Sequence, residues 1–404
     1  MKDSGGVVIA GAGPVGLVCA LALARQGIEV TVLETEADLI LDQRAGSIQP
    51  TTVEMLEKLG LADEFIARGL VAPTYHFRDR ETGKVVAEFD YAVLEQETPY
   101  PFVLQYEQYK VTRDIYAKHG DRDFKVLFSR KVTAVEQDAS QVTVTTEGPN
   151  GVERFAGSYV IGADGSHSIV RKSQEIAFEG FTYPERFVKI ATFYDFEEAF
   201  PDLCPRTYFS DPLEWCNLFK VKGERPQGIW RTVFPSRQGE TEEEALSPKG
   251  LEARMQRFFP RSEKYEIDNC AIYSVSQRVA STFVLGRVLL AGDAAHVNNP
   301  IGGLGLNSGI HDAVNLCEKL GRVLRDEAPA SLLDQYDRQR RKAALDFVQE
   351  QTIRNKKLLE ERDPAIRQKN FDNLRRTAET PELARAFLRR SALFESLKAT
   401  AQVE

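Results

Sequence analysis

The stretch VVIAGAGPVGLVCALALARQGIEVTVLE (residues 7–34) decides the fold of this chain. Two runs rich in β-branched residues, 7–11 and 29–34, flank a segment of helix-forming residues. Pro14 stands in the first turn of that segment and Gly27 just beyond its end, where helices commonly begin and end. The pattern predicts a strand–helix–strand unit with parallel strands and a right-handed crossover.

The turn between the first strand and the helix carries a G-x-G-x-x-G pattern at Gly11, Gly13 and Gly16. The first glycine makes the tight turn, the second lets the backbone approach a pyrophosphate, and the third lets the helix pack on the strand. Glu34 ends the second strand, where a carboxylate can accept hydrogen bonds from a ribose diol. The unit therefore predicts a site for FAD or an NAD-like dinucleotide, since a glycine-rich turn alone does not explain Glu34.

The composition narrows the class of protein. The 404 residues are 42% apolar and 28% charged, with a formal net charge of −8, which is typical of a globular chain of two or three domains without a nucleic-acid partner. The N-terminus lacks a signal-peptide pattern, and the apolar segment 15–24 is too short to span a bilayer. The five cysteines are scattered without C-x-x-C, and their odd number fits a reducing cytoplasm.

The pattern of apolar, polar and charged residues changes twice along the chain. Residues 74–90 and 186–277 alternate aromatic and polar side chains, which predicts a mostly antiparallel sheet with one face on a core or pocket. After Leu332 the chain is helical in pattern and rich in charge. We interpret these helices as an amphipathic layer packed on the main body, with a dimer surface as the alternative.

Two further strands end in an aspartate followed by a turn: YVIGADGSHSIVR (159–171), with Asp164, and GRVLLAGDAAHVNNPIGGLGLNSGIHDAVNL (286–316), with Asp293. Together with the N-terminal glycine motif, and in this order, they resemble the single-component FAD-dependent aromatic hydroxylases of the para-hydroxybenzoate hydroxylase family, the class A flavoprotein monooxygenases. The resemblance covers roughly residues 6–325. One departure is Leu304 and Leu306, where the family often has Gln and Met.

The resemblance implies an α/β fold: a glutathione-reductase-like FAD-binding Rossmann fold, an inserted mostly antiparallel β-sheet substrate domain and a C-terminal helical region. We divide the chain into these three parts as follows. The FAD-binding domain takes residues 1–73, 101–175 and 278–330, the substrate domain 74–100 and 176–277, and the helical region 331–404.

The resemblance also implies residues that bind FAD. The ADP half is assigned to the N-terminal glycines and Glu34, the ribityl and pyrophosphate region to Arg44, Gln105 and Asp293, and both FAD and the nicotinamide to Asp164. The flavin ring is bordered by the loop before a helix that begins near Leu306, and the positive end of that helix would face the ring. The full set is Gly11, Gly13, Gly16, Glu34, Arg44, Gln105, Asp164, Asp293, Pro300, Gly303, Gly305, Leu306 and Asn307.

The chemistry that follows from the resemblance is an NAD(P)H- and O2-dependent hydroxylation of a phenol or hydroxylated heteroaromatic ring through a flavin C4a-hydroperoxide. NADH or NADPH would bind transiently, because no second G-x-G-x-x-G follows a strand. The small aromatic substrate is expected between the flavin and the 186–234 sheet. Aromatic and polar candidates there are Tyr194, Tyr208, Trp215, Asn217, Trp230 and Arg231.

Tyr208 and Pro300 are the catalytic candidates, Tyr208 as a proton relay and Pro300 as part of the flavin and oxygen loop. His296 is expected to brace that loop, and no metal site is expected. Alternatives stay open: a reductase or dehydrogenase of the same fold, or a non-catalytic flavin- or ligand-binding protein. A flavin halogenase would carry W-x-W-x-I-P, and Trp215 and Trp230 are too far apart for it. We expect a cytoplasmic monomer or homodimer.

Overall fold

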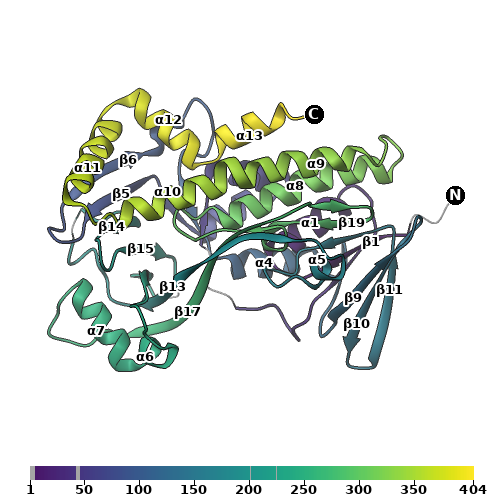
Figure 1. Ribbon diagram of the computed structural model, residues 1–404, viewed down its shortest axis with the longest axis horizontal. Helices are drawn as coiled ribbons and strands as arrows, with labels where there is room; N and C mark the ends of the chain where they lie inside the picture. The colour runs from purple at the N-terminus through teal and green to yellow at the C-terminus, as the bar shows by residue number, and fades with distance from the viewer. Residues whose placement is uncertain (1–4, 42–45, 201, 224) are drawn as a thin grey trace.

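The computed structural model describes residues 5–41, 46–200, 202–223 and 225–404 (Figure 1). The N-terminal unit consists of β1 (Val7–Ala10), α1 (Pro14–Ala24) and β2 (Val30–Leu33), with β1 and β2 parallel. They belong to a six-stranded sheet in the order β18-β19-β12-β1-β2-β8. Its other strands are β8 (Lys125–Leu127), β12 (Tyr159–Gly162), β18 (Val284–Leu285) and β19 (Val288–Leu290).

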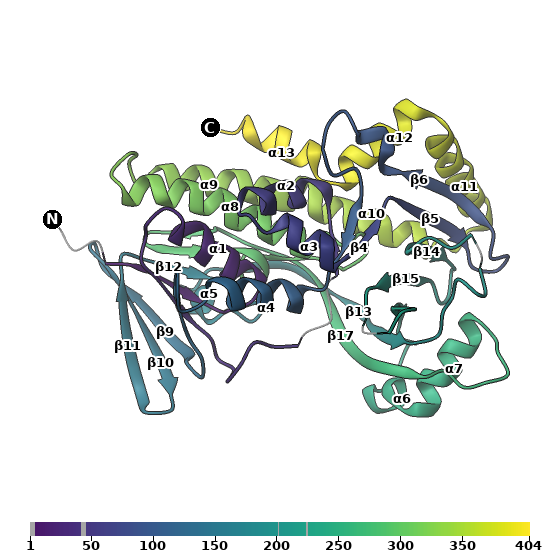
Figure 2. The same ribbon diagram turned by 180° about the vertical axis from the view of Figure 1, so that it is seen from behind.

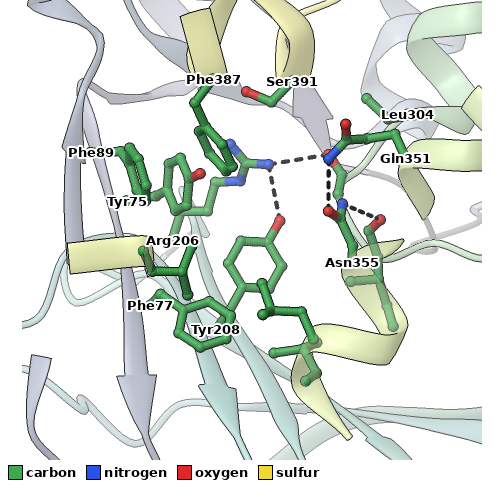
Figure 3. Close-up of a pocket in the computed structure, with 15 residues that line it drawn as sticks. Tyr75, Phe77, Phe89, Arg206, Tyr208, Leu304, Gln351, Asn355, Phe387 and Ser391 are labelled. Carbon is green, nitrogen blue, oxygen red and sulfur yellow. Dashed lines mark hydrogen bonds between the residues drawn. The ribbon is translucent and has the colours of Figure 1, made fainter. Parts of the chain in front are cut away.

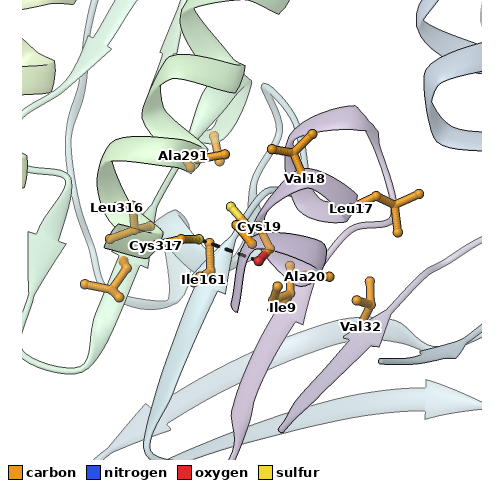
Figure 4. Close-up of a cluster of buried hydrophobic side chains, with 14 of the residues drawn as sticks. Ile9, Leu17, Val18, Cys19, Ala20, Val32, Ile161, Ala291, Leu316 and Cys317 are labelled. Atoms are coloured by element: carbon orange, nitrogen blue, oxygen red, sulfur yellow. Dashed lines mark hydrogen bonds between the residues drawn. The ribbon is translucent and has the colours of Figure 1, made fainter. Parts of the chain in front are cut away.

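The core of this part lies between the sheet and two helices. Helix α8 (Gly305–Leu324) packs beside α1, and the thiol of Cys317 on α8 donates to the carbonyl oxygen of Cys19 on α1 at 3.6 Å. Figure 4 shows side chains of β1, β2 and β12 gathered with those of both helices, among them Ile9 and Ile161, which are fully buried. This packing fixes where the N-termini of α1 and α8 point.

The second sheet has eight strands in the order β20-β17-β13-β16-β15-β14-β5-β6. All neighbours are antiparallel except β14 and β5. This confirms the expected α/β fold class with a mostly antiparallel second sheet. The strands are β5 (Thr74–Asp79), β6 (Val85–Asp90), β13 (Phe178–Thr192), β14 (Arg206–Ser210), β15 (Cys216–Val221), β16 (Ile229–Pro235), β17 (Ile267–Ala280) and β20 (His296–Val297).

Smaller elements complete the body. Helices α6 (Glu242–Leu246) and α7 (Pro248–Phe258) lie against one face of the eight-stranded sheet, and β9, β10 and β11 form an antiparallel sheet at the far end (Figure 2). The remaining elements are α2 (Pro50–Lys58), α3 (Ala62–Arg68), α4 (Gln108–His119), α5 (Ile169–Ser173), β3 (Ser47–Ile48), β4 (Leu70–Ala72), β7 (Val103–Gln105), β9 (Lys131–Gln137), β10 (Val142–Gly148) and β11 (Gly151–Gly157).

The C-terminal region packs on the body. It consists of α9 (Leu332–Lys342), a π-helical segment (Ala343–Gln349), α10 (Glu350–Leu359), α11 (Pro364–Glu379), α12 (Pro381–Ser391) and α13 (Phe394–Ala401). Leu374 and Leu388 are buried in one cluster with Tyr75 and Phe89 of the eight-stranded sheet. The charged helices therefore bury an apolar face against this sheet, as their amphipathic pattern predicts. No helix in the described ranges is long and apolar enough to cross a bilayer.

Candidate functional site

A cavity of about 770 Å³ lies where the two sheets meet. The residues that follow β1, β2, β12 and β19 all reach it, because the carboxyl ends of parallel strands share one edge of a sheet. Most of the predicted cofactor residues therefore come together although they are far apart in sequence. Those that line the cavity are Gly11, Gly13, Glu34, Gln105, Asp164, Asp293, Pro300, Gly303, Gly305 and Leu306.

The three N-terminal glycines have different surroundings. A Cβ on Gly11 (φ +100°) would lie 2.5 Å from the carbonyl oxygen of Ala163, and a Cβ on Gly16 would overlap the carbonyl oxygen of Gly11. Gly13 differs, since no atom lies within 4 Å of its Cβ position, so its backbone faces open cavity. Helix α1 begins there without a side-chain cap, which leaves its first amides available for phosphate oxygens.

The Glu34 carboxylate is held at the end of β2 by two backbone amides. One oxygen accepts from the amide of Ala12 at 2.7 Å and the other from the amide of Glu36 at 3.0 Å. These bonds orient the carboxylate along the cavity wall beside the glycine turn. The arrangement fits a ribose diol next to a pyrophosphate.

Two buried polar groups face the middle of the cavity with unused hydrogen-bonding capacity. The side-chain oxygen Oε1 of Gln105 accepts a hydrogen bond from the Ser47 hydroxyl at 2.8 Å, but Nε2 of the same side chain has no partner among the described residues. One oxygen of Asp164 accepts from the amides of Ile169 and Val170, and the other is buried without a partner in the described ranges. Burial raises the pKa of Asp164. Such unpartnered groups in a cavity are expected where a polar ligand completes the site, so the residues fit FAD.

The glycine loop 300–305 separates this cavity from the C-terminal helices. Gly302 (φ +110°) and Gly303 (φ +68°) adopt backbone conformations that favour glycine. Leu306 lines the cavity, whereas Leu304 points away from it and packs against Val348 and Leu393. Only one of the two leucines that depart from the family pattern therefore borders the flavin cavity.

Asn307 belongs to the predicted cofactor set but does not line the cavity. The side-chain oxygen Oδ1 of Asn307 accepts a hydrogen bond from the backbone amide of Gln49 at 2.7 Å. Its Nδ2 donates to the backbone carbonyl oxygens of Ser47 and Gly303 at 2.9 and 2.6 Å. Its side chain therefore ties the glycine loop to β3. Arg44 lies outside the described residues.

The eight-stranded sheet presents alternate side chains to the cavity. Asn217 and Phe219 of β15, with Arg231 and Val233 of β16, line it, and so does Lys189 of β13. Successive side chains of a strand point to opposite faces. Phe219, Val233 and Lys189 were not predicted, although the period-two pattern running on from Asn217 and Arg231 was a usable signal for the first two.

The structure does not bring Tyr194 and Trp230 to the cavity. Trp230 lies on the opposite face of β16 from Arg231, and its Nε1 donates to the Asp195 carboxylate at 3.1 Å. Tyr194 packs against Phe259 beyond helix α7. For Trp230 the physical reason is the alternation of side chains along a strand, because a shift of one residue changes the face. Tyr194 lies beyond the end of β13 at Thr192.

Tyr208 lies next to the cavity rather than in its wall. Its ring meets the ring of Phe219 edge-on, with centroids 5.7 Å apart, and it lines a second, smaller cavity behind the glycine loop. Trp215 packs against Phe187 and lines neither cavity. Of the aromatic candidates on this sheet, Tyr208 is the one placed beside the loop.

His296 is part of a buried ionic cluster. Its Nε2 lies 2.8 Å from an oxygen of Asp312, and Arg340 Nε donates to the other oxygen at 2.6 Å. Asp312 also accepts a hydrogen bond from the backbone amide of Gly292 at 3.0 Å. Gly292 directly precedes Asp293 in the chain. His296 and its partners hold the turn that presents Asp293. In the described ranges no cluster of residues suited to a metal ion is found.

Known proteins are similar to this chain in both sequence and architecture. The family model described as "FAD binding domain" matches residues 5–351. Para-nitrophenol 4-monooxygenase of Pseudomonas sp. (strain WBC-3) is 34% identical, over 91% of this chain and 90% of the relative. 6-Hydroxy-3-succinoylpyridine 3-monooxygenase of Pseudomonas putida (strain DSM 28022 / S16) is 30% identical, over 95% and 98%. The crystal structure of p-nitrophenol 4-monooxygenase from Pseudomonas putida DLL-E4 superposes with a TM-score of 0.90 at 33% identity, over 98% of this chain and 99% of that one.

Proposed function

Since the chain belongs to the FAD binding domain family and is an FAD-dependent aromatic hydroxylase, we propose that its substrate is a phenol or hydroxypyridine with a single ring and a polar substituent. NAD(P)H and O2 are its co-substrates. The proposal is supported by the two relatives that the chain matches over nearly their whole length. Their names give substrates in which one ring carries a hydroxyl and a polar group.

The observation that carries the proposal is the mixed character of the cavity wall on the eight-stranded sheet. Phe219 and Val233 offer apolar surface to the face of a ring, while Asn217 and Arg231 offer polar groups to its substituents. The side-chain oxygen Oδ1 of Asn217 is buried without a partner among the described residues. An apolar wall with a few placed polar groups is typical of small-molecule sites.

The residues of the chain bind the cofactor and position the substrate. Glu34 and the first amides of α1 hold the dinucleotide, Gln105 and Asp293 border its middle, and the uncapped start of α8 at Gly305 turns its positive end to the flavin loop. FAD, when bound, supplies the activation of O2 with electrons from the nicotinamide. The sheet wall orients the ring and keeps bulk water from it.

The test uses the purified FAD-loaded protein. Oxidation of NADH and NADPH is followed with 4-nitrophenol, 4-hydroxybenzoate and 6-hydroxynicotinate, and products are identified by mass. We expect at least one single-ring compound to stimulate oxidation and to gain an oxygen atom from O2. With 4-nitrophenol, oxygen added at the nitro-bearing carbon expels nitrite, so nitrite release identifies that position.

Three outcomes would contradict the proposal. Stimulated NAD(P)H oxidation with a reduced, oxygen-free product would favour a reductase. Flavin binding without NAD(P)H oxidation, whatever the ring compound, would favour a binding protein. Hydroxylation of polycyclic phenols alone would keep the hydroxylase and reject the single-ring substrate.

A further inference from the structure

A second cavity of about 50 Å³ lies behind the glycine loop, between the eight-stranded sheet and the C-terminal helices (Figure 3). Gly302 and Leu304 face this cavity, whereas Gly303 and Gly305 face the flavin cavity. The loop therefore separates the two. A cavity of this size has room for a few water-sized groups, so neither the flavin nor an aromatic ring can enter it.

Arg206 on β14 is the charged residue of this cavity wall. Its residue is only 4% exposed. The other residues that line the cavity in the described ranges are aromatic, aliphatic or uncharged and polar, and none of them is an aspartate or a glutamate. The Nε of Arg206 is buried and has no hydrogen-bond partner among the described residues. A buried donor without a partner at a cavity indicates that something else completes the site.

The hydrogen bonds of the guanidinium all reach uncharged oxygens in the described part of the chain. It donates to the hydroxyls of Tyr91 and Tyr208 at 3.0 and 2.9 Å, and to the carbonyl oxygen of Gly302 at 3.1 Å. Its central carbon also lies 5.1 Å from the centre of the Tyr75 ring. Such a cation–π contact offsets part of the cost of burial, but a ring carries no net charge.

The tyrosines around Arg206 do not supply a negative charge either. Burial raises the pKa of Tyr91, although Arg206 opposes that shift, and burial raises the pKa of Tyr75 well above its usual value. Both are therefore neutral phenols near neutral pH, whereas a guanidinium stays charged. Burying a charge without a counter-charge is strongly unfavourable, which points to an anion that comes from outside the chain.

The helix side of the cavity offers a further donor. The Nδ2 of Asn355 on α10 donates to the carbonyl oxygen of Ile301 at 3.2 Å. A side-chain amide nitrogen carries two hydrogens, so the second one is available to an acceptor in the cavity that Asn355 lines. A charged donor on the sheet side and a neutral donor on the helix side are suited to a small anion between them.

We propose that the small cavity binds a monovalent inorganic anion the size of chloride, with the Arg206 guanidinium as its main ligand. The anion supplies the counter-charge that the described chain lacks. Water alone would fill the cavity but would leave the charge unmatched. The site goes beyond the proposed hydroxylation and does not depend on its substrate, because the glycine loop separates it from the flavin cavity. No bond is made or broken in it.

The test measures thermal unfolding of the FAD-loaded protein while sodium chloride replaces sodium gluconate at constant ionic strength. Gluconate is too large for the cavity, so the exchange distinguishes occupation of the site from screening of surface charges. In the wild type the Tm should rise and saturate, by about 3 °C at a chloride concentration ~100 times the Kd. In Arg206→Met the saturable rise should be absent, and Arg206→Lys should keep part of it.

Arg78→Met is the matched control. Arg78 is also a buried arginine of the eight-stranded sheet, 2% exposed, but it pairs with Asp202 at 2.9 Å. Its replacement should lower the Tm in both salts and leave the rise with chloride intact. An equal loss of the chloride effect in both variants would mean that the effect does not report on the small cavity, and the proposal would fall.

Crystals of the FAD-loaded wild type grown with sodium bromide cover the case in which Arg206→Met does not fold. Anomalous scattering should place a bromide beside the Arg206 guanidinium. Water alone in the cavity would overturn the anion site. A bromide there without a saturable rise of the wild-type Tm would mean binding at crystal concentration only, and would also overturn it. The proposed hydroxylase stands or falls separately, since its test measures oxygen transfer to a ring.

Discussion

Arg206 and Arg340 are buried to nearly the same degree, 4% and 2% exposed, and their surroundings differ in one respect. Arg340 pairs with Asp312, which is in turn held by His296 and the Gly292 amide. Among the described residues, Arg206 donates only to neutral oxygens. A buried charge that is matched within the chain serves the fold, whereas an unmatched one at a cavity indicates a ligand. The same distinction separates other polar groups around the glycine loop.

The largest expected effect comes from breaking the matched cluster. Asp312→Ala leaves Arg340 as a buried cation without a partner and should lower the free energy of unfolding by about 3–5 kcal/mol. Urea denaturation followed by circular dichroism measures this. Arg206→Met, which removes an already unmatched charge, should cost far less or even stabilise the ligand-free protein. If both changes destabilise equally, the distinction between the two arginines is wrong.

The next largest effect is a pH dependence of the free energy of unfolding. It comes from His311, which is next to Asp312 in sequence and is influenced by the charge of Arg340. Burial lowers the pKa of His311 to about 3, with a further contribution from Arg340. Because the folded state then binds fewer protons than the unfolded state, the stability is complete above the unfolded pKa of ~6.5 and is lost as the pH falls. The slope due to this residue should be about 1.4 kcal/mol per pH unit, or about 2 kcal/mol between pH ~6.5 and ~5.

His311→Asn provides the control for this slope. Unfolding of wild type and variant should be compared between pH ~5 and ~6.5, where most carboxylates stay ionised, so that the difference between the two slopes belongs to His311. The hydrogen bond between the ring Nε2 and the Thr52 hydroxyl, 3.0 Å long, is lost or changed at every pH and shifts the curve without tilting it. Parallel curves for the two proteins would rule out a buried neutral His311.

The parts of the site that the sequence predicted are those set by local pattern. Gly11, Glu34 and Asp293 follow buried strands, and the carboxyl ends of parallel strands meet at one edge whatever the rest of the chain does. Trp230 was a poorer candidate than Arg231, because the face of a strand depends on which side the sheet buries. Arg206 was not singled out at all. Its significance depends on the absence of an ion-paired acid around it in the described ranges. It also depends on α12, whose Phe387 lines the same cavity although it lies far along the chain.

The smallest expected effect tests the comparison on two side-chain amides beside the flavin cavity. Asn307 uses its carbonyl and its amide nitrogen in protein contacts, whereas Gln105 has a buried Nε2 without a partner among the described residues. Asn307→Leu should therefore lower the free energy of unfolding of the ligand-free protein by about 1–3 kcal/mol, since it strands the Gln49 amide. Gln105→Leu should lower it less, since only the hydrogen bond from the Ser47 hydroxyl is lost. It should mainly weaken FAD binding, by about 0.5–1.5 kcal/mol or roughly threefold to tenfold in Kd.

Flavin fluorescence titration of the FAD-depleted proteins and denaturation of the same samples measure the two quantities side by side. The expected result is a crossed pattern: stability falls mainly in the Asn307 variant, and FAD affinity mainly in the Gln105 variant. If Gln105→Leu retains full FAD affinity, its unpartnered nitrogen does not face the cofactor. The rule that unmatched polar groups indicate a ligand would then fail at the position where it is easiest to measure, and the case for Arg206 would rest on its charge alone.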